Sequence, residues 1–310
     1  MPVEQELGNL SLDGDTLLTI GVFDGVHRGH QHLISQLMKQ ARQQNLLGGV
    51  VTFRQHPQEI LSPRTRLPYL TSVDEKVRLL KNEGIDLVVV LSFTAELARL
   101  SMVEFVGLLK KYLRMRGLVV GPDFALGRNR EGDIDTLRKL GKDMEFNVTV
   151  VPPLKRNGEV VSSTAIRQAL AAGDVRRVSD LIGRPFRLQG RIVSGAGRGS
   201  KLVVPTANLE ADPNQALPAD GVYATRSDVD GKVYQSMTNI GHQPTFDGSG
   251  RTVETYILNY NGNLYGHELK IDFVERLRGE KRFDTTEELK RQIDEDIKKG
   301  VAILNSRSKN

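Results

Sequence analysis

Two histidines, His27 and His30, lie three residues apart in a glycine-rich stretch suited to binding the phosphates of a nucleotide. The stretch starts at Gly21, after an apolar run, and leads into a run whose apolar residues share one helical face. We therefore expect a strand, a tight turn and a helix start, with both imidazoles on one side. Free backbone N–H groups at such a turn bind phosphate, and Gly25 and Gly29 leave space for a ligand.

The lysine-bearing phosphate loop of many nucleotide-binding proteins is absent from this chain. The alternative interpretation of the histidine stretch is a surface turn with two incidental histidines.

Other stretches are expected at the same edge of a sheet, where the carboxyl ends of parallel strands meet. They are residues 51–57, 121–132 and 161–167. The first is otherwise a strand ended by proline. The second is rich in glycine and arginine and suits an anionic ligand, unless Asp123 only caps a turn. In the third, Ser162 or Ser163 is a good N-cap, and Arg167 would point from the first helical turn toward the phosphates.

The second half of the chain offers oxygen ligands and a carboxylate. A glycine-rich loop able to approach phosphates contains Gly195, Gly197 and Arg198. Thr206 and Asn208 supply a hydroxyl and an amide oxygen, both hard ligands that suit Mg²⁺, although the spacing alone favours a turn motif at 205–208. Glu254 lies in an alternating strand, where most glutamates simply face water.

The elements that position the first group alternate between strand and helix. Strands are predicted at 16–22, 49–53, 86–92, 117–121 and 147–151, and helices at 28–44, 73–83, 101–115, 133–141 and 163–172. Continuous apolar strands indicate a sheet covered on both faces. The first half is therefore predicted to be an α/β doubly wound parallel sheet.

The pattern changes near 181–186, where glycine and proline interrupt the helical periodicity. Short alternating strands follow at 186–194, 221–227, 232–240, 253–260 and 268–275, and then a helix at 285–299. These segments predict a small antiparallel β-barrel with a C-terminal helix. The expected domains are residues 1–182 and 183–310.

Composition narrows the class of protein. The 310 residues include no cysteine, which excludes disulfides, thiolate zinc sites and a cysteine nucleophile, and fits a reducing cytoplasm. The first residues include Glu4 and Glu6 and lack an apolar core, so we expect no signal peptide, and no apolar run approaches the length of about 18 residues that a membrane span needs. The net charge of +5 is compatible with anionic ligands or with scattered surface charge, and no basic block indicates nucleic acid. We expect a cytoplasmic protein that binds neither nucleic acid nor membranes.

The string GxFDGxHxGH at 21–30 resembles the HxGH-type nucleotidylyltransferases, and more narrowly the adenylylation module of the bacterial bifunctional riboflavin kinase / FAD synthetase family. The family motifs TFxPHP, GxDFxFGxxRxGD and SSTxIR follow in order. The resemblance implies that His27, His30 and Arg167 stabilise the polyphosphate. It implies that Gly21, Phe23 and Asp24 line the ATP pocket and that Asp123 lies near the adenosine or the flavin. Ser163 and Thr164 are expected to bind the nucleotide. Arg54, Ala125 and Leu126 depart from the usual Glu, Arg and Phe.

The second half resembles the riboflavin kinase module, with GR, PTANL, GVYA, NIGxxPTF, VExxIL, LYG and LRxExxF in order over nearly all of 183–300. The resemblance implies that Thr206 and Asn208 bind Mg²⁺ and an ATP phosphate. It makes Glu254 the base for the ribityl hydroxyl and places Arg278 against the flavin. Val203 stands where the family usually has glycine.

Taken together, the resemblance implies an enzyme that phosphorylates riboflavin to FMN and adenylylates FMN to FAD, with ATP as co-substrate and Mg²⁺ on its phosphates. Its partners are then small molecules, namely riboflavin, FMN and ATP. Two alternatives stay open: an FMN adenylyltransferase with a degenerate kinase module, and a flavin-binding regulator without turnover. Oligomeric state does not follow from the sequence.

Overall fold

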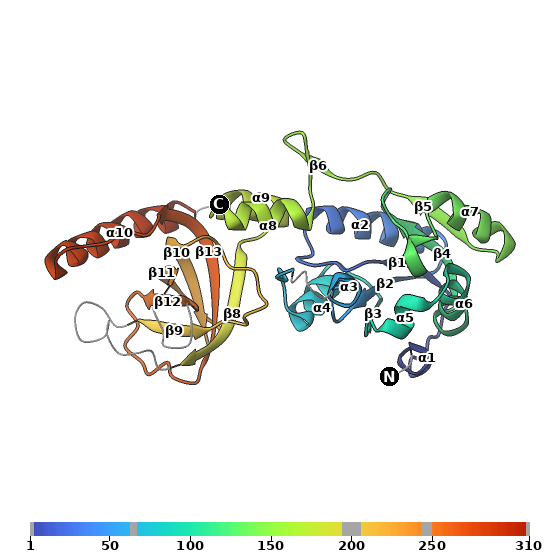
Figure 1. Cartoon of the computed structure of the whole chain (residues 1–310), viewed down its shortest axis with the longest axis horizontal. Helices are drawn as coiled ribbons and strands as arrows, with labels where there is room; N and C mark the ends of the chain where they lie inside the picture. Colours follow the sequence, from blue (N-terminus) through green and yellow to red (C-terminus); the bar gives the residue numbers. More distant parts are fainter. Residues whose placement is uncertain (1–2, 63–66, 194–205, 243–249, 308–310) are drawn as a thin grey trace. The chain divides into compact units, whose positions relative to one another are not determined.

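The computed structural model describes residues 3–62, 67–193, 206–242 and 250–307. The chain divides into two compact units, residues 1–163 and 164–310 (Figure 1). Each unit has its own sheet, so each is described by itself. Within the described residues, no helix is both long and apolar enough to cross a membrane.

The first unit is built around a five-stranded parallel sheet with strand order β3-β2-β1-β4-β5. Its strands are β1 (Thr16–Ile20), β2 (Leu47–Phe53), β3 (Leu87–Leu91), β4 (Met115–Val120) and β5 (Asn147–Val150). The order reverses direction between β1 and β4, which is the point where open α/β sheets bind ligands. The predicted parallel sheet is therefore confirmed, and the histidine stretch follows its central strand.

Helices cover both faces of this sheet (Figure 1). The helices of this unit are α1 (Val3–Gly8), α2 (Arg28–Gln43), α3 (Pro57–Leu61), α4 (Val73–Asn82), α5 (Ala95–Arg99), α6 (Met102–Leu113) and α7 (Ile134–Asp143), and all of them except α3 contribute to the two cores. Alternate residues of β1 enter different cores: Leu17 packs with α2 and α4, whereas Leu18 packs with α6. Burial on both faces is what the continuous apolar strands predicted.

The short helices α1, α3 and α5 lack a long periodic pattern, and the sequence did not predict them. The helix expected at 101–115 ends at Leu113, because Arg114 adopts a left-handed conformation and Met115 already begins β4. A small hairpin of β6 (Lys155–Arg156) and β7 (Glu159–Val160) precedes α8 (Ser163–Ala171), which crosses the boundary between the units.

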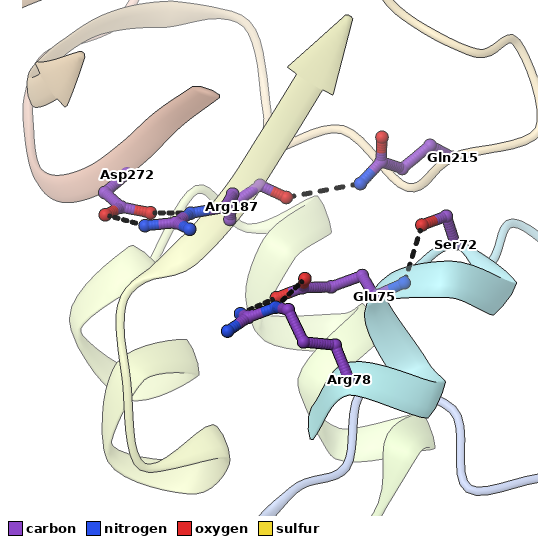
Figure 2. A network of polar contacts seen from close by, with 6 residues as sticks. All are labelled: Ser72, Glu75, Arg78, Arg187, Gln215 and Asp272. Atoms are coloured by element: carbon purple, nitrogen blue, oxygen red, sulfur yellow. Dashed lines mark hydrogen bonds and ion pairs between the residues drawn. The ribbon is translucent and has the colours of Figure 1, made fainter. Parts of the chain in front are cut away.

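The second unit contains a closed six-stranded barrel in the order β10-β11-β12-β9-β8-β13. Its strands are β8 (Phe186–Val193), β9 (Ala207–Glu210), β10 (Gly221–Val229), β11 (Lys232–His242), β12 (Arg251–Ile257) and β13 (Glu268–Arg278). All pairings are antiparallel, which confirms the predicted barrel. Arg187 on β8 and Asp272 on β13 form two hydrogen bonds of 2.7 Å across neighbouring strands (Figure 2).

Two further helices belong to this unit. The C-terminal helix α10 (Thr286–Ser306) packs against β10, β11 and β13, and its N-cap is Thr285, whose hydroxyl accepts a hydrogen bond from the backbone N–H of Glu288. Helix α9 (Val175–Ile182) was not predicted. It ends at Ile182, and its C-cap is Gly183. The φ of Gly183 is 93°, a left-handed conformation that glycine often adopts at the end of a helix. The interruption near 181–186 is thus a helix end, while a domain boundary between 182 and 183 stays a prediction.

Candidate functional site

The backbone between β1 and α2 makes an unusually strained turn, which we call the elbow (residues 21–30). Phe23 and Val26 have φ values of 52° and 37°, and Gly25 has a φ of 81°. A branched residue such as valine rarely adopts a positive φ, so the surrounding structure must hold this conformation in place. Strain of this kind concentrates at functional sites.

The two imidazoles of the elbow lie together. Their ring centroids are 3.6 Å apart with an interplanar angle of 16°, so the rings are stacked. His27 is the N-cap of α2, and its Nδ1 accepts a hydrogen bond of 3.3 Å from the backbone N–H of His30. The aromatic ring of Phe23 lies 4.9 Å from the His30 ring. The prediction that both histidines face one side is therefore confirmed.

Several backbone N–H groups of the elbow, which the sequence analysis expected to bind a ligand, donate hydrogen bonds to protein atoms. The backbone N–H of Gly25 donates to Thr71 Oγ1, and those of Val26 and His30 donate to Phe23 O and His27 Nδ1. The expectation of free amide groups is therefore wrong at these positions, because the elbow closes on itself and on the loop before α4.

Protein atoms also explain the two glycines. A Cβ on Gly25 would lie 2.9 Å from the Leu70 side chain, and a Cβ on Gly29 would lie 2.9 Å from the Val161 carbonyl oxygen. The space beside these glycines therefore holds packed neighbours, where the sequence predicted a ligand. The requirement for glycine stands, but its reason is packing together with the positive φ of Gly25.

His30 carries little charge at neutral pH. Burial lowers its pKa well below the usual value, and the neighbouring His27 and the Lys76 ammonium lower it further. Its Nδ1 atom is shielded from solvent and has no hydrogen-bond partner among the described residues. A neutral imidazole donates one N–H, and an approaching polyphosphate would favour its protonation.

Hydrogen bonds of two charged residues, Asp24 and Lys76, hold the elbow in place. The Asp24 carboxylate is 6% exposed and accepts hydrogen bonds from the backbone N–H groups of Leu70 and Thr71, at 2.9 to 3.2 Å. Lys76 on α4 is 4% exposed, and its ammonium donates to the Val22 and Phe53 carbonyl oxygens. The sequence analysis did not identify Lys76. The signal was its spacing, since Lys76, Leu79 and Leu80 share the buried face of α4.

The other predicted residues of the first half have varied surroundings. Ser163 donates to the Asp24 carbonyl oxygen at 3.0 Å, which ties the start of α8 to the elbow. Asp123 is exposed, and its carbonyl oxygen accepts from Arg130. Thr164 and Arg167 lie in α8, within the range of the second unit.

The departures from the family pattern are not equivalent. Arg54 is exposed after β2 and Ala125 is partly buried, whereas Leu126 is 7% exposed and packs in the core beside α6. A change from phenylalanine to leucine at 126 therefore alters core packing. In the same region, His56 caps α3 and Pro57 occupies its first turn, so proline starts a helix after β2.

In the barrel, Glu254 lies between two asparagines. Its register partners are Asn208 on β9 and Asn239 on β11, so the three side chains share one face of adjacent strands. The neighbouring Thr255 is buried and bonds Thr238 on the opposite face. Burial raises the pKa of Glu254 above its ordinary value, which makes the carboxylate a stronger base.

Register alone brought Asn239 to this group, and the sequence analysis missed it. The sequence analysis also favoured a turn at 205–208, but Asn208 lies in β9. Thr206 immediately precedes this strand and is partly buried. Gly195, Gly197, Arg198 and Val203 lie outside the described residues.

Arg278, predicted to contact the flavin, is held by a buried carboxylate. Its guanidinium bonds both oxygens of Asp296 on α10, at 2.9 to 3.2 Å, and Asp296 is 6% exposed. The guanidinium also lies 5.7 Å from the Phe283 ring centroid. Arg278 is therefore fixed in a position that presents a cation beside an aromatic face.

Comparison with known proteins assigns the two halves separately. A model of the FAD synthetase family matches residues 10–165, and a model of the riboflavin kinase family matches residues 182–304. Bifunctional riboflavin kinase/FMN adenylyltransferases are similar over nearly the whole chain. The protein from Pseudomonas fluorescens is 37% identical, covering 92% of each chain. The one from Listeria monocytogenes is 34% identical, covering 92% of this chain and 91% of its own.

A solved structure described as a macrolide-efflux protein from Streptococcus pneumoniae superposes with a TM-score of 0.87 at 30% identity. It covers 94% of this chain and 95% of its own, so the similarity extends over both units. The order of the two family matches and the names of the relatives indicate the same family, and the histidine elbow lies within the FAD synthetase match. The chain belongs to the bifunctional riboflavin kinase/FMN adenylyltransferase family and carries both of its domains.

Proposed function

We propose that this chain itself catalyses both reactions, converting riboflavin to FMN and FMN to FAD. The stacked imidazoles at the switch point of the sheet carry the adenylylation half of this proposal. The carboxylate between two asparagines carries the kinase half. We assign adenylyl transfer to residues 1–182 and phosphorylation to residues 183–310.

In adenylyl transfer, an oxygen of the FMN phosphate attacks the α-phosphorus of ATP, the bond to the β-phosphate oxygen breaks, and pyrophosphate leaves. The attacking phosphate is already ionised, so the site needs no general base. Catalysis then depends on positioning and on stabilising charge. His27, His30 and Arg167 supply that stabilisation, with Ser163, Thr164 and Asp123 contacting the nucleotide or flavin.

In phosphorylation, the ribityl hydroxyl of riboflavin attacks the γ-phosphorus of ATP, and ADP leaves. A neutral alcohol is a poor nucleophile, so the Glu254 carboxylate accepts its proton as the new bond forms. The raised pKa of Glu254 suits this task because it increases the basicity of the carboxylate. Arg278 contacts the flavin, and Gly195, Gly197 and Arg198 approach the ATP phosphates.

Mg²⁺ fits the barrel site through the chemistry of its donors. Thr206 and Asn208 offer neutral oxygen ligands, and Mg²⁺ is usually bound by few protein ligands together with substrate phosphates. The described residues contain no cluster of three or more His, Cys, Asp or Glu that would hold a metal by themselves. The ion would neutralise charge on the ATP phosphates.

A cytoplasmic location and a lack of nucleic-acid partners stay predictions.

The test is incubation of the purified protein with riboflavin, ATP and Mg²⁺, followed by chromatographic separation of FMN and FAD. A parallel reaction starts from FMN. Both products are expected from riboflavin, and FAD from FMN. FAD formed only from added FMN would leave an adenylyltransferase with a degenerate kinase module. Flavin binding with neither product would leave a regulator.

A further inference from the structure

Lys76 occupies a position that is unfavourable for a lysine on two counts. It lies in the first turn of α4, whose N-terminus is marked by the Ser72 N-cap (Figure 2), where the helix dipole disfavours positive charge. It is also only 4% exposed, and burying an ammonium costs several kcal/mol unless it is well paired. Burial lowers the pKa of Lys76 to about 8, so most molecules still carry the charge at neutral pH.

The hydrogen bonds of this buried ammonium lead directly to the elbow. Its Nζ donates to the Phe53 carbonyl oxygen at 2.7 Å and to the Val22 carbonyl oxygen at 3.1 Å. Phe53 is the last residue of β2, and Val22 follows the end of β1 by two residues. Because β1 and β2 are neighbouring parallel strands, both carbonyls lie at the carboxyl edge of the sheet. Thr52 Oγ1 donates to the same Val22 oxygen at 2.9 Å. The chain is thus clamped one residue before the strained Phe23.

The elbow is also held through Asp24, whose carboxylate accepts hydrogen bonds from the backbone N–H groups of Leu70 and Thr71. The Asp24 carboxylate also attracts the Lys76 ammonium electrostatically. Both supports act on the segment that leads to His27 and His30. A shift of this backbone would move the two stacked rings together, because His27 caps the helix that carries His30.

We propose that Lys76 is a positioning residue for adenylyl transfer: its ammonium clamps the Val22 carbonyl and thereby sets the positions of His27 and His30 beneath the polyphosphate. This inference rests on the proposed function, since it concerns how the same site works. Lys76 acts through the elbow backbone and needs no contact with the substrate.

The first test is Lys76→Met, which retains the apolar stem and removes the ammonium. We expect kcat for FAD formation from FMN to fall about a hundredfold, while KM for ATP stays within about threefold, because positioning affects the transition state more than ground-state binding. The matched control is Lys81→Met, an exposed lysine on the same helix. Riboflavin phosphorylation by the same protein should stay unchanged and reports on intact folding.

The second test separates charge from packing. Because the chain contains no cysteine, Lys76→Cys introduces a single thiol. The variant is alkylated in denaturant with 2-bromoethylamine, which restores an ammonium, or with 1-bromopropane, which gives a neutral side chain of equal length. After refolding, the aminoethyl protein should regain FAD formation to within about tenfold of wild type, and the propyl protein should resemble Lys76→Met.

Equal activity of the two alkylated proteins would overturn the inference, and so would a Lys76→Met protein with kcat within about threefold of wild type. If Lys76→Met also loses kinase activity, its loss of FAD formation could reflect misfolding, and the comparison of the aminoethyl and propyl proteins then tests the inference. Wild-type protein taken through the same refolding is the reference for both. Wild-type protein that forms no FAD from FMN would overturn the proposed function, and this inference with it.

Discussion

The elbow of the α/β unit and the carboxylate group of the barrel handle phosphorus chemistry in opposite ways. At the elbow, burial lowers the pKa of His30, and precision comes from a strained backbone held by the hydrogen bonds of Asp24 and Lys76. In the barrel, regular strands present Glu254 between two amides, and burial makes its carboxylate more basic. The difference follows from the proposed nucleophiles, because an ionised phosphate needs positioning whereas a neutral hydroxyl also needs a base.

The largest expected effect tests the base. Glu254→Ala should lower FMN formation by about 10²–10⁴-fold, because no other group is assigned to accept the hydroxyl proton. FAD formation from added FMN should persist. Rates are measured by chromatography of the flavins, and Glu268→Gln, an exposed strand glutamate, serves as the control. A Glu254→Ala protein that still phosphorylates riboflavin at the wild-type rate would remove the assigned base.

The next effect concerns the other half of the comparison. His30→Ala should lower FAD formation from FMN by about 10²-fold or more, since loss of one preorganised donor raises the barrier by about 3 kcal/mol. FMN formation should remain. His32→Ala, on the same helix, is the control. Loss of both activities in His30→Ala would show that the two sites do not act independently.

A smaller effect is expected where the barrel relies on positioning. Asp296→Asn weakens the pairing that holds Arg278, so KM for riboflavin should rise about three- to tenfold with little change in kcat. Asp294→Asn, an exposed change on the same helix, should have no effect. An unchanged KM in Asp296→Asn would mean that Arg278 does not depend on this carboxylate to contact the flavin.

The smallest effect concerns stability. Burial raises the pKa of Glu254 above 4.5, so the folded state holds this proton more tightly than the unfolded chain does. The carboxylate therefore costs stability above the raised pKa, and the cost disappears below about pH 4, where both states are protonated. Glu254→Gln should raise the thermal midpoint slightly at neutral pH and leave it unchanged at low pH. Stabilisation that persists at low pH would have another cause.

The sequence predicted the elements of the site better than it predicted their support. His27, His30 and Glu254 are found in the expected turn, helix and strand, because local periodicity specifies element type. Lys76 was missed because a lysine beside an apolar helix face usually extends its ammonium into solvent. Only the packed structure shows that two backbone carbonyls accept hydrogen bonds from this ammonium. Asn239 was missed because it meets Glu254 through strand register, which depends on residues far apart in the chain.

By itself, the sequence determined the order of the two domains, the parallel sheet, the barrel and the family to which the chain belongs. Motif spacing and hydrophobic periodicity are local properties, so they can be read along the chain. Only the tertiary structure decided that Leu126 enters the core, that Gly25 and Gly29 face packed protein atoms, and that the imidazoles stack. These features depend on the register and close packing of distant segments, because contact distances are set by the folded backbone as a whole.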